Sequence, residues 1–111
     1  MVRFLISDAN GARLGLYTKD SALCVGGMDR DRDSLATVRN TVECAIVPFL
    51  PADATGVVWT LRKVQRNKSV WSIILRDEEA AEAAARASAA ALQIIPGVLV
   101  APVKKLGNVV Y

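Results

Sequence analysis

The sequence predicts an α+β domain in which an antiparallel sheet is covered by one helical layer. Short runs rich in β-branched and aromatic residues come first, and an alanine-rich helical segment follows them. The chain has 111 residues, of which 52% are hydrophobic and 23% charged, a composition typical of one globular domain rather than a disordered chain. We therefore treat residues 1–111 as a single domain.

An N-terminal hairpin within residues 1–20 has the clearest signal among the strands. The runs VRFLIS (2–7) and RLGLYTK (13–19) flank Asn10-Gly11, a dipeptide that favours a tight turn between antiparallel strands. The apolar run ALCVGG (22–27) then predicts a third strand.

The next stretch is less clear. DRDRD (29–33) is interpreted as a solvated loop, and TVRNTVECAIVPFL (37–50) fits either a strand or a helix. As a strand, one face would hold Val38, Asn40, Val42, Cys44 and Ile46; as a helix, the spacing of Leu35, Val38, Val42 and Ile46 would be correct. Its threonines and valines, together with Pro48, favour the strand.

A second hairpin is predicted over residues 57–76. VVWTLRKVQR (57–66) and SVWSIILR (69–76) are β-rich runs on either side of a short polar turn at Asn67-Lys68. On the first of these runs, Thr60, Arg62 and Arg66 lie on one side. We assign the sheet strands to residues 21–76.

A helix is predicted to begin at Asp77, whose carboxylate can cap free backbone N–H groups. Nine of the twelve residues from Ala80 to Ala91 are alanine, the best helix former, and Glu82 and Arg86 form an i,i+4 pair. Pro96-Gly97 ends the helix. The tail that follows fits either a strand at 98–101 or a second short helix.

One alanine-rich helix offers too little apolar surface to cover five or six strands. Part of the sheet would then stay uncovered in a single copy, and an oligomer would supply the missing cover. The apolar residues concerned are Val57, Trp59, Leu61, Trp71, Ile73 and Leu75.

Catalysis has little support in the composition. The chain has no histidine, which removes the commonest general base and the commonest metal ligand. No nucleophile elbow, phosphate loop or carboxylate-rich metal site is present in the sequence. We therefore expect no enzyme, no cofactor, no metal and no small-molecule substrate. The net charge of +3 is compatible with a polyanionic partner.

Two further features concern the chain's surroundings. The sequence has no run of about 18 apolar residues, which argues against a membrane span. The N-terminus lacks the apolar stretch of a signal peptide. Cys24 and Cys44 have no metal-ligand spacing and are interpreted as buried thiols.

The order of elements resembles the coat proteins of single-stranded RNA bacteriophages of the levivirus type. SVWSIIL is similar to their last strand, RDEEAAEAAARASAAALQII to the acidic link and first helix, and PGVLVAPVKKLGNVVY to the second helix and terminal tyrosine, here Tyr111. Upstream, VRFLIS and RLGLYTK resemble the family's N-terminal hairpin. ALCVGG, TVRNTVECAIV and VVWTLRKVQR resemble its successive strands.

The resemblance implies an N-terminal hairpin, an antiparallel sheet and two C-terminal helices, with residues 77–111 forming a helical dimerisation arm. Two subunits would interlock, each laying its helices on the sheet of the other. Dimers would assemble in the bacterial cytoplasm into an icosahedral shell around genomic RNA, so that the protein resides in the virion. The residues expected at the dimer interface are Ala84, Ala87, Ala91, Leu92 and Ile95.

The resemblance also implies that the sheet face away from the helices touches RNA, and it suggests that this face binds an RNA hairpin as a translational repressor. Arginine and lysine would neutralise phosphates, and hydroxyl groups would read base edges or the 2′-OH. Glu43 would share this face, which is unfavourable near phosphate. The residues carried over are Arg39, Thr41, Thr60, Arg62, Arg66, Lys68 and Ser72.

Two other interpretations stay open at this point. Arginine and threonine are also the ordinary surface residues of a sheet face open to water, with no ligand. The chain could accordingly be a small dimeric α+β binding or inhibitor protein that forms no shell.

Overall fold

The described parts of the chain form six strands and two α-helices. The structure is a computed structural model that describes residues 2–7, 13–26, 32–53, 56–65 and 68–103, with the backbone alone for residues 32–36, 62–65 and 68–69. The elements in chain order are β1 (Arg3–Ser7), β2 (Arg13–Lys19), β3 (Ala22–Gly26), α1 (Arg32–Ile46), the 3-10 turn η1 (Val47–Phe49), β4 (Thr60–Gln65), β5 (Lys68–Ile74), α2 (Glu78–Gln93) and β6 (Leu99–Pro102).

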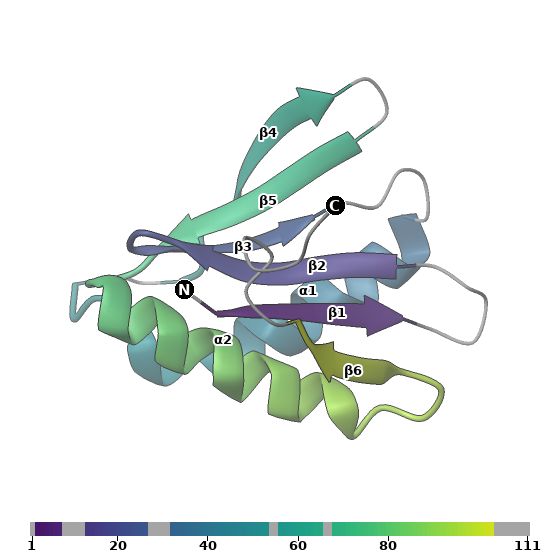
Figure 1. Cartoon of the computed structure of the whole chain (residues 1–111). Helices are drawn as coiled ribbons and strands as arrows, with labels where there is room; N and C mark the ends of the chain where they lie inside the picture. Colours follow the sequence, from purple (N-terminus) through teal and green to yellow (C-terminus); the bar gives the residue numbers. More distant parts are fainter. Residues whose placement is uncertain (1, 8–12, 27–31, 54–55, 66–67, 104–111) are drawn as a thin grey trace.

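All six strands belong to one antiparallel sheet with the order β4-β5-β3-β2-β1-β6 (Figure 1). The predicted hairpins are confirmed as β1–β2 and β4–β5, and the third predicted strand is β3. The turn residues Asn10 and Gly11 lie outside the described residues. The α+β class is therefore confirmed, with a sheet that includes both ends of the described chain.

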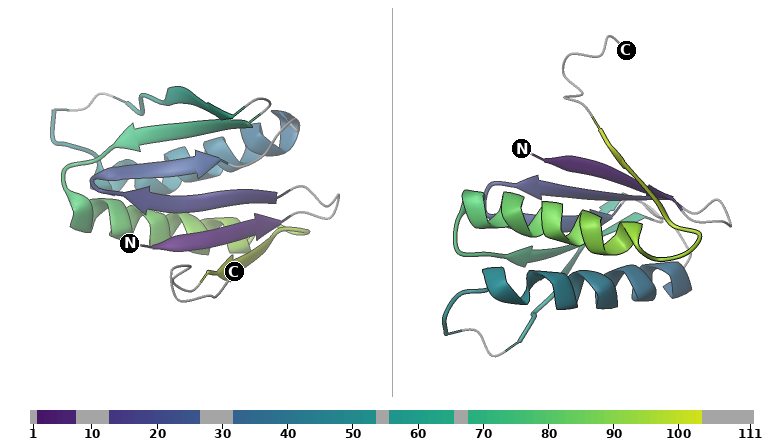
Figure 2. Two further views of the ribbon diagram at one scale, coloured as in Figure 1. Left: turned by 45° about the horizontal axis from the view of Figure 1, so that its top comes forward. Right: turned by 90° about the horizontal axis from the view of Figure 1, so that it is seen from below.

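Both helices lie on the same face of the sheet, side by side (Figure 2, right). On the central strands every second residue points toward the helices and is buried, as Leu14 and Leu16 are on β2 and Leu23 and Val25 are on β3. Neither of the two described helices lies on the opposite face (Figure 2, left). The core consequently lies in one layer between sheet and helices.

The prediction of a strand over residues 37–50 is wrong, because α1 occupies most of this segment. Val38, Val42 and Ile46 are buried, whereas Asn40 and Cys44 are exposed, so burial follows the helical spacing and not the alternation of a strand. Burial of this apolar stripe against α2 and the sheet outweighs the weak strand preference of threonine and valine.

Threonine and proline in this segment fit the helix in specific ways. Thr41 donates a hydrogen bond from its hydroxyl to the carbonyl oxygen of Thr37, 2.9 Å away, a bond that β-branched hydroxyl residues make inside helices. Pro48 lies in the first turn of η1, where its missing N–H costs nothing. Residues that favour a strand in the sequence are thus accommodated in and after α1.

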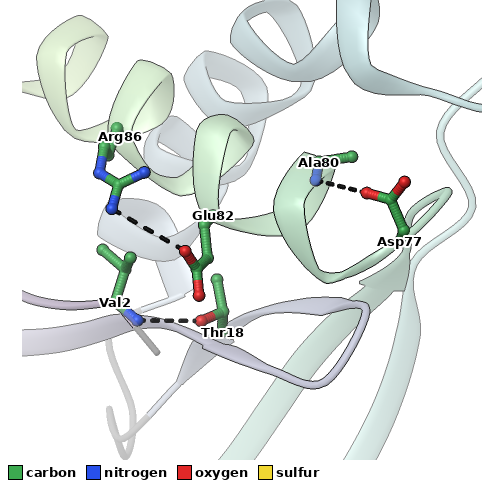
Figure 3. Close-up of polar contacts among 6 residues, drawn as sticks. All are labelled: Val2, Thr18, Asp77, Ala80, Glu82 and Arg86. Atoms are coloured by element: carbon green, nitrogen blue, oxygen red, sulfur yellow. Dashed lines mark hydrogen bonds and ion pairs between the residues drawn. The ribbon is translucent and has the colours of Figure 1, made fainter.

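The start of α2 is as predicted. The Asp77 carboxylate accepts a hydrogen bond of 2.7 Å from the backbone N–H of Ala80, and Glu82 pairs with Arg86 at 3.9 Å (Figure 3). Nearby, the backbone N–H of Val2 donates to the hydroxyl of Thr18, a buried polar side chain on the helix side of β2 (Figure 3). The capping signals in the sequence therefore place this helix end correctly.

The alanine-rich helix packs on the sheet of its own chain. It contacts α1, β2, β3 and β6, and Ala84 and Leu92 are fully buried within the monomer. Within one chain Ala84 and Leu92 therefore belong to the core, and their place in a dimer interface stays a prediction. Ala87, Ala91 and Ile95 are half-buried, and Ile95 packs against the same core.

The tail after α2 returns to the sheet as β6, which pairs with β1. The expected second C-terminal helix is therefore wrong where it covers Leu99–Pro102, and the strand alternative is confirmed. Gly97 adopts a φ of 82°, a left-handed conformation suited to glycine, where the chain turns back. Residues 104–111, with Tyr111, lie outside the described residues.

These elements revise the division of the chain. The segment 21–76 holds α1 as well as strands, and the segment 77–111 holds β6 as well as α2. Cys24 is buried, as expected, but Cys44 is exposed on α1, so the prediction of two buried thiols is wrong for Cys44.

Replacing Ala84 with leucine should overfill the layer between α2 and the sheet. We expect the free energy of unfolding to fall by about 1–3 kcal/mol, measured by urea denaturation followed by circular dichroism. Ala90 is exposed on the same helix, so Ala90→Leu should change stability by no more than about 0.5 kcal/mol. Equal stability of the two variants would contradict the packing of α2 on its own sheet.

Candidate functional site on the uncovered sheet face

The candidate site is the sheet face away from the helices, here called the open face. Directly opposed residues of antiparallel strands share a face, so the strand registers assign its members. They alternate along each strand with the buried residues that point toward the helices. Described residues of the open face are Arg3, Leu5, Ser7, Arg13, Gly15, Tyr17, Lys19, Ala22, Cys24, Gly26, Thr60, Val70, Ser72, Ile74, Leu99 and Ala101.

The charges of the chain are divided between sheet and helices. The six strands contain no aspartate or glutamate, but they contain six lysines and arginines. The acidic residues of α2 and its cap lie on the helix side, at Asp77, Glu78, Glu79 and Glu82. On the open face, Arg13 and Lys19 are exposed and Arg3 is half-buried. The described cations of this face therefore have no acidic residue beside them on the described strands.

A row of side chains crosses five strands of the open face in direct register: Thr60, Ser72, Cys24, Tyr17 and Arg3. With strands about 4.8 Å apart, the row is about 19 Å long. Cys24 is only 6% exposed and Ser72 only 8%, so the middle of this row is buried. The Arg3 guanidinium carbon lies 5.1 Å from the centre of the Tyr17 ring, a cation–π contact.

The neighbouring row is bare at its centre. Gly15 on β2 lies directly opposite Gly26 on β3, and Leu5 and Val70 stand on either side of this pair. A Cβ atom at position 15 would lie 3.3 Å from the Gly26 carbonyl oxygen, which is tighter than ordinary contact. We call Gly15 and Gly26 the glycine floor, because neither residue has a side chain; Gly15 is half-buried and Gly26 is buried.

Large apolar side chains are also exposed on the open face. Leu5 is 37% exposed, Ile74 65% and Leu99 71%, and they come from three different strands. A face that combines exposed apolar groups with arginine and lysine suits a ligand that has both apolar surfaces and negative charges.

Four of the predicted RNA-binding residues come from β4 and β5. Thr60 and Ser72 are direct partners on the open face, as the alternation of the two runs predicts. Arg62 is at the next open-face register position, opposite Val70, and Lys68 begins β5 opposite Gln65. The structure describes only the backbone of Arg62 and Lys68, and Arg66 lies outside the described residues.

Arg39 and Thr41 are not on a neighbouring strand, so their predicted position on this face is wrong. Both lie on α1, on the helix side of the sheet, because the segment is helical. The guanidinium carbon of Arg39 is 4.1 Å from the centre of the Trp71 ring and 5.4 Å from that of Trp59. Arg39 thus covers both tryptophans of the chain and does not face the open side.

Glu43 completes this arrangement, and we call Arg39, Glu43, Trp59 and Trp71 the arginine–tryptophan cluster. The indole N–H of Trp59 donates to the Glu43 carboxylate, which also lies 4.0 Å from the Arg39 guanidinium. The expected conflict between Glu43 and phosphate is therefore removed, because Glu43 is on the other side of the sheet. The cluster attaches α1 to the β4–β5 hairpin.

Four residues of the open face were not among the RNA-binding residues predicted from the sequence: Arg3, Arg13, Tyr17 and Lys19. A usable signal was present in RLGLYTK, where the buried Leu14, Leu16 and Thr18 alternate with the open-face residues. In a half-covered sheet the polar set of such a strand lies on the open side. Only the position of the helices, however, shows which face stays uncovered.

Other kinds of site find no support in the described residues. No group of three or more histidine, cysteine, aspartate or glutamate side chains in the described parts could hold a metal ion. Among the described helices, none is long and apolar enough to cross a membrane.

Comparison of the chain with protein-family models, with curated proteins and with solved structures finds no match. The function proposed for this protein therefore depends on the chemistry of the open face.

Replacing Arg39 with methionine keeps a long apolar side chain over the tryptophans but removes the cation. We expect a loss of about 1 kcal/mol of stability and a change in tryptophan fluorescence, because both indoles contact Arg39. Arg86→Met removes an exposed i,i+4 pair instead and should cost no more than about 0.5 kcal/mol. Equal denaturation midpoints for the two variants would show that the cluster contributes little.

Proposed function

We propose that this protein binds single-stranded RNA on the open face of its sheet. The observation that carries the proposal is the division of charge: the strands hold lysine and arginine but no acidic residue, while the acidic cap and first turn of α2 lie on the other side. A polyanion approaching the open face meets cations and no opposing carboxylate on the described strands.

The same charge argues against a second copy as the occupant of this face. Two open faces brought together would place Arg13 and Lys19 of one chain near the same residues of the other, and like charges would repel. A negatively charged partner avoids this cost. An acidic peptide would share the advantage, and the experiments below separate it from RNA.

Unpaired bases fit the face better than a duplex. In a duplex the bases are stacked inside, whereas single strands can place bases against aromatic and apolar side chains. The open face offers Tyr17 and the exposed apolar residues Leu5, Ile74 and Leu99 between its cations. Base stacking and phosphate pairing can therefore occur together on one surface.

The proposal is tested with a labelled single-stranded RNA of mixed sequence and fluorescence anisotropy at several salt concentrations. Changing both Arg13 and Lys19 to glutamate should weaken binding roughly tenfold or more and reduce the salt slope by about 1.4, since each lost phosphate contact contributes about 0.7 on single strands. The matched control is Arg76→Glu with Arg86→Glu, which makes the same charge change at exposed positions outside the described strands.

The control double variant should bind the RNA more tightly than the double variant of Arg13 and Lys19 at every salt concentration. Equal weakening by the two pairs would mean that net charge, and not the open face, determines binding. Absence of RNA binding by the wild-type protein at low salt would refute the proposal outright.

A coat function, suggested by the resemblance to levivirus-type coat proteins, stays a prediction. Edge strands β4 and β6 each have one unpaired side among the described strands, and such edges are where sheets of separate subunits can join. The packing of α2 on its own sheet removes one earlier reason to expect an interlocked dimer.

Expression together with RNA tests the coat prediction. Negative-stain microscopy should then show uniform particles, and their absorbance ratio at 260 and 280 nm should show packaged RNA. A monomer or small oligomer under all conditions would contradict a shell and leave an RNA-binding module. An oligomer that binds no RNA would instead favour the small dimeric binding or inhibitor protein.

A further inference from the structure

Strand β2 presents a regular series of side chains on the open face. In order they are Arg13, Gly15, Tyr17 and Lys19, a cation, a bare position, an aromatic ring and a second cation. Successive members are about 6.6 Å apart, because same-face residues of a strand are two positions apart. The series places one aromatic ring and one bare patch between two exposed positive charges.

The two glycines of the floor differ in exposure, because Gly15 is half-buried whereas Gly26 is buried. Gly15 pairs directly with Gly26, so the glycine floor covers two adjacent central strands. The Cδ1 atom of the Tyr17 ring is 3.6 Å from where a Cβ of residue 15 would stand. The ring therefore borders the floor, and any side chain larger than hydrogen at position 15 would intrude between them.

Tyr17 is held in place from both neighbouring strands. It lies opposite the buried Cys24 on β3 and opposite Arg3 on β1, whose guanidinium contacts the ring. A ring fixed in this way loses little further conformational entropy when a flat ligand packs against it. The cation beside the ring also favours a ligand that has a negative group close to its flat part.

We propose that Tyr17 and the half-buried backbone of Gly15 form a subsite for one unpaired nucleobase of single-stranded RNA, with Arg3, Arg13 and Lys19 placed for the adjoining phosphates. The base packs against the Tyr17 ring over the backbone of Gly15. This inference depends on the proposed function, because it names the position at which the open face takes a base.

The test uses a labelled single-stranded RNA and two variants of one residue. Tyr17→Leu keeps an apolar side chain over Cys24 but removes the ring, and it should weaken binding roughly 5- to 150-fold. Its salt slope should stay that of the wild-type protein, because no cation is lost. Tyr17→Phe keeps the ring and should recover most of the lost affinity. Circular dichroism verifies that both variants fold.

Two measurements on the wild-type protein need no variant. A base-free oligomer with the same sugar–phosphate chain should bind more weakly than the RNA by a similar factor. Ultraviolet light should cross-link RNA to Tyr17. After trypsin digestion, the cross-linked RNA should be found on the peptide from Leu14 to Lys19, which contains Tyr17.

The outcomes separate this inference from the proposed function. If the wild-type protein binds RNA but Tyr17→Leu and the base-free oligomer bind equally well, the base subsite is wrong and the electrostatic proposal stands. If polyglutamate binds as tightly as the RNA, the face recognises charge alone and the base subsite is again wrong. If the wild-type protein binds no RNA, both proposals fail.

Discussion

The placement of both helices on one face of the sheet determines the rest of this structure. α2 can lie against β2, β3 and α1 at the same time because its buried side chains are mostly alanine, with Ser88 and Leu92 as the larger exceptions. Small side chains allow close approach of backbones, and dispersion contacts then hold the layers together. With two helices on one face, the opposite face of the six strands has no helix from the part of the chain that the structure describes.

Because the helices cover only one face, charged residues of the strands such as Arg13 and Lys19 can be assigned to the open face. Lysine and arginine on strands are half of an ordinary amphipathic pattern when the other half is buried leucine and valine. What differs from an ordinary solvated face is the absence of acidic residues from the described strands and the exposed apolar groups between the cations. Solubility alone would be served as well by mixed charges. The proposals on RNA follow from this difference.

The arginine–tryptophan cluster lies on the helix side and contacts the β4–β5 hairpin, which also contributes residues to the open face. Trp71 on β5 contacts Arg39 on the helix side, and its neighbour Ser72 lies on the open face opposite Thr60. Stacking of Arg39 on two indoles therefore fixes the hairpin that carries part of the open face. The buried Arg39 Nε and Trp71 Nε1 have no hydrogen-bond partner among the described residues, which offsets some of the gain from stacking.

Local signals in the sequence determined the two hairpins, β3, and the cap and first turn of α2. They also placed Thr60 and Ser72 on one face, since period-two alternation is a property of the strand itself. The structure of segment 37–50 was not determined by local signals. Its helix depends on tertiary packing, because Val38, Val42 and Ile46 can be buried only against a second layer. The same holds for Leu99–Pro102, whose pairing with β1 is a contact between the two ends of the chain. Which face of the sheet α2 covers, and therefore which face stays open, depends on contacts between residues that are distant in sequence. Only the tertiary structure decided these contacts.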